Sequence, residues 1–318
     1  MVPQEPGSSP LPSAVRSAEY QCINASAHPD RTIVVGVDGS EHADRALDWA
    51  AEQASLETRP LTVLNASDPF GTTQSLYLAS GGIAPHEVLI AERDARRSLV
   101  ERAAEQVRAT HPELEVRTEV PGIDARVALL EASNEAGMIV VGSRGRGPVA
   151  SLLLGSVSVA VSRLACCPVV VVRPSDLHAA KLGAFVATDA TARSSHTVEA
   201  AFRLAAFRGV PLTVGHCAWD VDAASAGWLS VRPGDAGHDD LMVAVSETLA
   251  GLRERYPDVG VEVVIARGHA DGFVVDLAKC SEIVVVGRHG YSVLDHWGLG
   301  SMATSVVEHA RCAVLVVP

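Results

Sequence analysis

The run Ile33–Ser40 reads IVVGVDGS, an apolar stretch that passes directly into a turn sequence. Short runs of Val and Ile are typical of strands that are buried on both faces of a parallel sheet. Ser40 is a favourable N-cap for a following helix. Apolar residues then recur at the spacing of one helix face, at Ala43, Ala46, Leu47, Ala50 and Ala54. A second apolar run at 60–64 completes a strand–helix–strand unit.

The second half of the chain repeats this unit. Asp38 and Asp189 each end an apolar strand, and they are 151 positions apart. Further along, the strand ends Gly142 and Gly287 are 145 positions apart. A constant spacing on each side of a single gap indicates duplication of one structural unit.

Each copy alternates five apolar strands with helical stripes. This order predicts right-handed crossovers and a parallel sheet that is covered by helices on both faces. We therefore expect an α/β fold with two tandem, open, Rossmann-like sheets of five parallel strands. Residues 1–30 show no periodicity and are predicted to be a disordered tail, followed by one domain at 31–174 and a second at 181–318.

Composition limits the classes of function. The chain has 318 residues, a net charge of −12 and no apolar run near the ~18 residues of a membrane span. An acidic chain lacks the basic surface that binds nucleic acid, so neither nucleic acid nor membrane is an expected partner. The six cysteines have no disulfide-type spacing, which predicts buried free thiols and a cytoplasmic location.

The strongest functional motif follows the fourth strand of each copy. Residues 142–156 and 287–301 share the pattern Gly-x2-Gly-x9-Gly-Ser, between an apolar strand and a helical stripe. Glycines let a ligand approach the backbone, and the free amides at a helix start attract phosphate oxygens. The pattern differs from the Walker loop and from the dinucleotide fingerprint. It predicts a phosphate-binding cradle in each copy.

In the first copy, several side chains add to this cradle. Ser156 and Ser158 offer hydroxyl donors, and Arg144 and Arg146 supply positive charge. Asp38 is expected to accept from ribose hydroxyls or to hold Mg²⁺. Each of these residues also has a purely structural interpretation, such as a turn or a helix cap, but their joint recurrence favours nucleotide binding.

Together these motifs resemble the tandem form of the universal stress protein family, over about residues 31–318. The resemblance implies that ATP is the ligand and that the residue after the second strand meets adenine, here Ala66. It also implies edge-to-edge pairing of the last strands, 169–172 and 314–317, as a pseudo-dimer within the chain, and a homodimer as a further partner arrangement. The nucleotide-binding residues so expected are Gly36, Asp38, Ala66, Gly142, Arg144, Gly145, Arg146, Gly155, Ser156, Val157 and Ser158 in the first copy, and Asp189, Gly287, Arg288, Gly290, Gly300 and Ser301 in the second.

The second copy departs from the pattern, because Ala187 stands at the position of Gly36 and Ala190-Thr191 follows Asp189. The expected function is that of an ATP-binding regulator or sensor of stress. No residue is spaced in a way that requires a water-orienting role, so no catalytic residue is assigned. A slow ATP-hydrolysing or adenylating enzyme of the same fold is the alternative, and a dimerisation scaffold with empty pockets is a third hypothesis.

Overall fold

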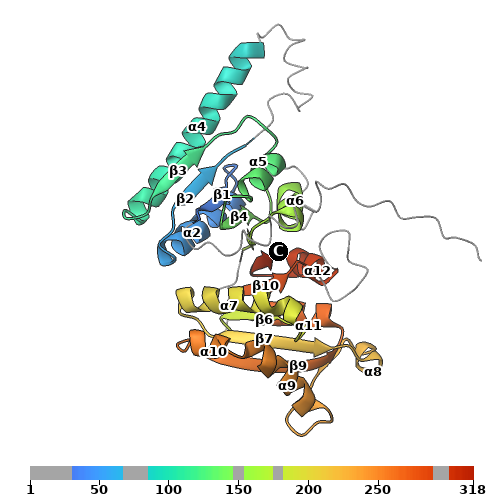
Figure 1. Cartoon of the computed structure of the whole chain (residues 1–318). Helices are drawn as coiled ribbons and strands as arrows, with labels where there is room; N and C mark the ends of the chain where they lie inside the picture. The colour runs from blue at the N-terminus through green and yellow to red at the C-terminus, as the bar shows by residue number, and fades with distance from the viewer. Residues whose placement is uncertain (1–30, 67–84, 146–153, 175–181, 289–300) are drawn as a thin grey trace, which may run out of the picture.

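The computed structural model describes residues 31–66, 85–145, 154–174, 182–288 and 301–318 (Figure 1). The predicted tail lies outside these residues. Strands and helices alternate through the first half, in the order that the sequence predicts. They are β1 (Ile33–Gly36), α2 (Glu41–Leu56), β2 (Leu61–Leu64), α4 (Pro85–Thr110), β3 (Val116–Glu119), α5 (Ala125–Ala132), β4 (Met138–Gly142), α6 (Ser156–Leu164) and β5 (Val169–Val172).

The second half repeats this order and adds short elements to it. The added elements lie mainly between the second and third parallel strands of this half. The full set is β6 (Ala184–Ala187), the 3₁₀ turn η1 (Ala192–Ser194), α7 (Ser195–Arg208), β7 (Leu212–Ala218), α8 (Val221–Ala224), β8 (Trp228–Ser230), α9 (His238–Leu249), α10 (Leu252–Arg255), β9 (Val261–Gly268), α11 (Ala270–Ala278), β10 (Ile283–Gly287), α12 (Ser301–His309) and β11 (Ala313–Val317).

All the described strands belong to one sheet, in the order β3-β2-β1-β4-β5-β11-β10-β6-β7-β9-β8. Each half contributes five parallel strands, which confirms the predicted α/β class. The halves join where β5 and β11 pair antiparallel, with Leu315 opposite Val170. The two expected sheets are therefore one continuous sheet. The antiparallel edge strand β8 was not predicted.

Helices cover both faces of this sheet (Figure 1). The predicted apolar stripe of α2 is buried against one face, since Ala43 is 3% exposed and Ala46, Ala50 and Ala54 are fully buried. On the other face, α5 packs beside α6 and α11 beside α12. Leu164 at the end of α6 is an exception among the apolar residues of the helices, since it is 62% exposed.

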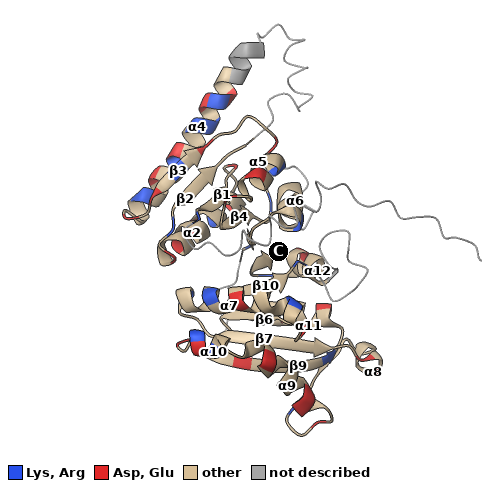
Figure 2. Cartoon of the chain, viewed as in Figure 1, with Lys and Arg blue, Asp and Glu red and all other residues tan. Residues whose placement is uncertain are grey.

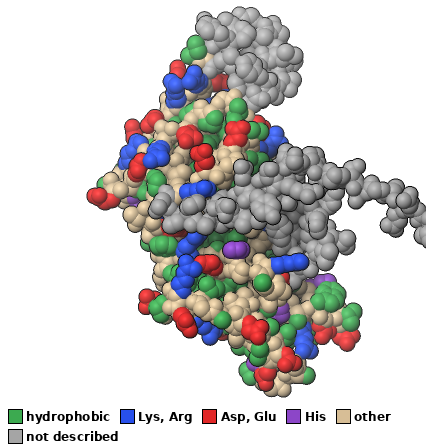
Figure 3. Space-filling model, in the orientation of Figure 1, with side chains coloured by type: hydrophobic (Ala, Val, Ile, Leu, Met, Phe, Trp, Pro, Cys, Tyr) green, Lys and Arg blue, Asp and Glu red, His purple; other side chains and the backbone are tan. Residues whose placement is uncertain are grey.

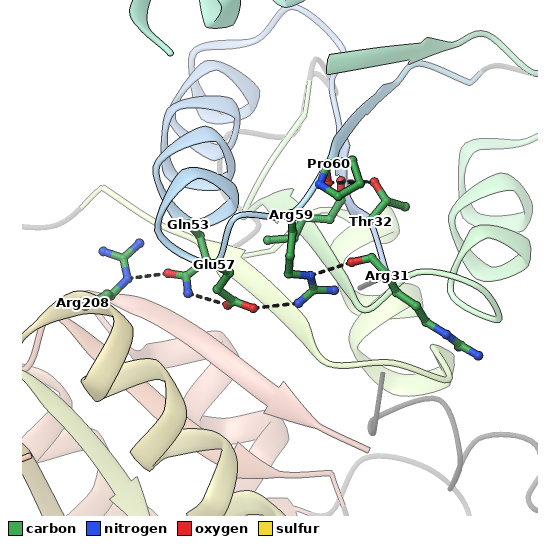
Figure 4. A network of polar contacts seen from close by, with 8 residues as sticks. Arg31, Thr32, Gln53, Glu57, Arg59, Pro60 and Arg208 are labelled. Atoms are coloured by element: carbon green, nitrogen blue, oxygen red, sulfur yellow. Dashed lines mark hydrogen bonds and ion pairs between the residues drawn. The ribbon is translucent and has the colours of Figure 1, made fainter. Parts of the chain in front are cut away.

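Polar side chains connect the helices α2 and α7 across the junction of the halves (Figure 4). Arg208 Nε donates to Gln53 Oε1 over 2.8 Å, and Gln53 Nε2 donates to Glu57 Oε1 over 2.6 Å. Glu57 also forms an ion pair with Arg59 (2.8 Å), whose Nε donates to the Arg31 carbonyl. The Glu57 and Arg59 side chains are only 5% and 4% exposed, so this pair is a buried part of the junction.

The cysteines agree only in part with the sequence prediction. Cys167, Cys217 and Cys312 are buried free thiols, as expected, and burial raises the pKa of Cys167 and of Cys312 to about 12. Cys280 is free but exposed. Cys166 is disulfide-bonded, so the expectation of a free thiol is wrong for this residue.

The surface carries both signs of charge. Acidic and basic side chains alternate along α4 and are interspersed over the face drawn in Figures 2 and 3. Within the described residues, no helix combines the length and the apolar character that crossing a membrane would require.

Candidate functional site

A cavity of about 620 Å³ opens in the first half at the carboxyl ends of the strands. It lies between β1 and β4, where the strand order reverses, which is the usual ligand position in open α/β sheets. Of the eleven first-copy residues predicted from the sequence, all except Arg146 are described, and the cavity brings these ten together. Its lining comprises Gly36, Val37, Asp38, His42, Ala43, Leu64, Ala66, Ala125, Leu129, Val141, Gly142, Arg144, Gly145, Leu154, Gly155, Ser156, Val157 and Ser158.

Asp38 lies directly after β1, where the chain turns into α2. Its Oδ1 accepts from the amide of Ser40 over 2.9 Å, and Gly39 between them has a φ of +77°. Ser40 caps α2 by accepting from the amide of Ala43. The turn thus holds the half-buried Asp38 carboxylate at the wall of the cavity. There it can accept a hydrogen bond from a hydroxyl, or bind a metal ion that also binds a phosphate.

The glycines of the loop have different roles from those expected. A Cβ on Gly142 would lie 2.6 Å from the His42 carbonyl oxygen, so this glycine allows α2 to pack closely. Gly36 similarly faces Leu129, at 3.3 Å. A Cβ on Gly145 would lie 2.6 Å from Asp38 Oδ2. Close packing against α2 therefore requires a glycine at Gly142, and Gly142 and Gly36 both line the cavity.

The amino end of α6 provides the anion-binding face of the cavity. Its N-cap is Gly155, which has no side chain to accept from the first-turn amides, and Ser156 is exposed beside it. Four amides at a helix start lack partners within the helix, and the helix dipole makes this end positive. Ser158 differs from the prediction, because its hydroxyl donates to the Gly155 and Ser143 carbonyls and so ties the loop to the helix.

Two further polar side chains line the cavity, Arg144 from the loop and His42 from the first turn of α2. His42 Nδ1 lies 3.4 Å from the Ser143 hydroxyl. Burial, with the nearby positive charges of Arg45 and Arg144, lowers the pKa of His42 below its usual value. Near neutral pH the His42 imidazole is therefore neutral, and it shares the described part of the cavity lining with Arg144 and Asp38.

The rest of the lining is apolar and comes from the strand ends and α5. Leu64, Leu129 and Leu154 form this wall with Val141, and Ala66 lies at its rim. Beside Ala66, the buried Asn65 donates from Nδ2 to the Val37 carbonyl over 2.6 Å. An apolar wall opposite a few convergent polar groups is the usual composition of a small-molecule site.

The second-half site is only partly described, because Gly290 and Gly300, like Arg146 of the first half, lie outside the described residues. Asp189 follows β6 and accepts from the amide and hydroxyl of Thr191. Arg288 follows β10, but its Nη1 donates to the Ala165 carbonyl of the first half over 2.5 Å. Arg288 is thus engaged at the junction of the halves, contrary to its predicted role in the cradle. Gly287 ends β10, and Ser301 begins α12.

Sequence reasoning missed His42 and the apolar wall. His42 lies two residues after the helix cap Ser40, in a first turn that starts at the carboxyl end of β1, and this position was the available signal. Leu154 directly precedes Gly155, within the nine-residue spacer. Within the described part of the chain, no three His, Cys, Asp or Glu side chains form a metal-binding group, so Asp38 is a single carboxylate candidate.

A duplicated parallel α/β unit, with a ligand-sized cavity at the reversal of strand order, defines the class of this protein. A model of the universal stress protein family matches residues 30–173 and 184–318. Universal stress proteins of Mycolicibacterium smegmatis and Mycobacterium tuberculosis are each 34% identical to this chain. The alignments cover 90% and 89% of this chain, respectively, and 96% of each relative. The chain belongs to the universal stress protein family, in tandem form.

Solved structures agree on the fold. A universal stress protein from Archaeoglobus fulgidus superimposes with a TM-score of 0.66 and 19% identity, over 91% of this chain and 97% of that one. A putative universal stress protein from Pseudomonas aeruginosa gives a TM-score of 0.56 at 16% identity, over 92% and 94%. The resemblance found in the sequence is confirmed.

Proposed function

We propose that the first half binds ATP in the cavity at β1 and β4, and that the protein is an ATP-binding regulator or sensor of stress. The observation that carries this proposal is one cavity whose lining combines two kinds of group. The uncapped start of α6 and Arg144 are polar, and the side chains of Leu64 and Leu129 are apolar. Phosphates suit the first kind of group, and an adenine ring suits the second.

Asp38 also lines the proposed site. Its carboxylate suits ribose hydroxyls, and it also suits a Mg²⁺ ion, which binds proteins through one or two carboxylates together with substrate phosphates. The volume of about 620 Å³ lies inside the range of small-molecule pockets. ATP with Mg²⁺ is therefore the ligand that we propose for this site.

Slow ATP hydrolysis is the second candidate function, and His42 is the observation that favours it. A neutral imidazole beside Arg144 supplies one group able to orient water and another able to offset developing charge. The proposal also includes ATP binding in the second half, a cytoplasmic location and a homodimer of the two-domain chain. Family membership supports these parts.

The α6 N-cap allows a sharp test of the proposal. Gly155 has φ −78° and ψ 153°, which any residue adopts, and a Cβ there would make ordinary contacts from 3.5 Å. In G155D, the carboxylate is expected to cap the first-turn amides and to repel phosphate. G155A is the matched control, because it adds a Cβ without a charge or a cap.

Binding of Mg-ATP is measured by titration calorimetry, and a single-turnover assay follows ADP and AMP. G155D is expected to weaken binding at least 100-fold with an unchanged or higher Tm, whereas G155A stays close to the wild type. Wild-type protein that neither retains nor binds ATP contradicts the proposal, and so does G155D that binds as tightly as G155A. Formation of ADP at the first site selects the hydrolytic function.

A further inference from the structure

Two arginines cross the junction between the halves, and each reaches the carboxyl end of a helix in the other half. Arg288, directly after β10, donates to the carbonyl of Ala165, the C-cap of α6. Arg173, directly after β5, donates to the carbonyls of Val307 and Glu308 in the last turn of α12. Helix carboxyl ends favour such cations, because their last carbonyls lack partners within the helix.

The helix held by Arg288 is the one that carries the proposed phosphate site. Residues Ser156–Leu164 form only nine residues of helix, so its two ends are about 13 Å apart at a rise of ~1.5 Å per residue. Ala165 is 1% exposed and Arg288 is half-buried, so water has little access to this contact. The position of the Gly155 end is therefore tied to a residue of the second half.

We infer that Arg288 is a positioning residue that couples the halves, because its contact with the carboxyl end of α6 sets the amino end of that helix for anion binding in the first cavity. The inference rests on the proposed ATP site. It makes the second half a determinant of first-site affinity without any contact with the nucleotide.

The test uses the full chain and Mg-ATP. Titration calorimetry compares the wild type with R288A, R288K and R163A. Arg163 is the matched control, because it lies in the last turn of the same helix but is exposed. R288A is expected to weaken ATP binding about tenfold, within the usual range of coupling. R163A should stay within about twofold of the wild type, which separates anchoring from the general effect of charge on the helix dipole.

If R288A does not fold, R288K takes its place, with an expected loss that is smaller but still exceeds that of R163A.

The outcomes separate the two proposals. ATP binding by the wild type, together with Arg288 variants that match R163A, overturns the coupling alone. A wild type that binds no ATP overturns the proposed function, and the coupling with it.

Discussion

The two halves distribute large and small side chains differently between the second strand and the helix of the same buried cluster. In the first half, Leu64 at the end of β2 and the small Ala128 of α5 belong to this cluster. At the corresponding positions of the second half, β7 has Gly215 and α11 has Phe273. A Cβ on Gly215 would lie 2.5 Å from the Phe185 ring and 2.9 Å from the Phe273 ring. The larger side chain of the pair lies on the strand in the first half and on the helix in the second half. Aromatic rings occupy the second half where the first has aliphatic groups.

The turn after the first strand of each half, in contrast, is conserved in detail. Asp38 accepts from the Ser40 amide, and Asp189 accepts from the Thr191 amide, both over 2.9 Å. This aspartate therefore shapes the turn in both halves, whatever ligand is bound. Its recurrence in the sequence is not by itself a sign of nucleotide binding.

A buried polar side chain is also kept at one position of the second strand. Asn65 bonds to the Val37 carbonyl, and His216 lies 3.0 Å from the corresponding Thr188 carbonyl. Different residue types thus satisfy the same backbone group. Comparing equivalent positions of the two halves distinguishes residues that the fold requires from residues that differ where a ligand would lie. Four sets of variants test this distinction.

The largest effect is expected at a pair that only the first half has. Glu57 and Arg59 form a buried ion pair, and their second-half counterparts are Arg208 and Val210. E57Q leaves the Arg59 charge buried without its partner, which should cost about 4 kcal/mol in the free energy of unfolding. Urea unfolding measures this cost. E115Q, in an exposed pair, is the control, and an equal effect of both variants would show that the buried pair is dispensable.

Exchanging the packing pair comes next. G215L, which copies Leu64, overlaps the phenylalanine rings and should lower the free energy of unfolding by about 3 kcal/mol. Adding F273A, which copies Ala128, should restore a large part of that loss in urea unfolding. Additive losses in the double variant would contradict the proposed exchange of volume.

The third variant gives the first loop the residue of the second. R144H introduces histidine, the residue type found at position 289, and removes the guanidinium that lines the cavity. At pH 8 the new imidazole is neutral. Loss of a charged hydrogen bond is worth about 2 kcal/mol, or roughly 30-fold in the Kd for ATP. Titration calorimetry reports this Kd. R126H, an exposed arginine outside the cavity lining, should change nothing, and equal affinities of the two variants would remove Arg144 from the site.

The smallest effect concerns backbone conformation. Ala190 has a φ of +57°, where the first half has Gly39 at +77°. A190G relieves about 1 kcal/mol of left-handed strain, and the freedom of glycine in the unfolded chain offsets about half of it. Thermal unfolding should therefore show a gain of about 0.5 kcal/mol, and G39A a loss of similar size. A loss in A190G would mean that the Ala190 methyl contributes packing.

The sequence was sufficient for much of this structure because its signals are local and occur twice. Apolar runs such as 33–36 and 139–142 gave the central strands, and the stripe on α2 gave its buried face. The spacing of Gly145 and Gly155 placed the loop and the helix start at one edge of the sheet, and the cavity brings them together.

The remaining features depend on partners that are distant in the sequence. The three residues of β8 form a strand only because β9 pairs with them. Gly142 is required by the backbone of α2, about one hundred positions earlier, rather than by a ligand. Arg288 looked like a residue of its own loop, but it reaches a carbonyl of the other half. No local pattern contains such information.

The antiparallel pairing of β5 with β11 has a thermodynamic consequence. Two separate chains that met through these strands would dissociate on dilution, whereas strands of one chain meet at an effective concentration in the millimolar range. The association of the halves is therefore unimolecular. It does not depend on the protein concentration, so β5 and β11 remain paired when the protein is dilute.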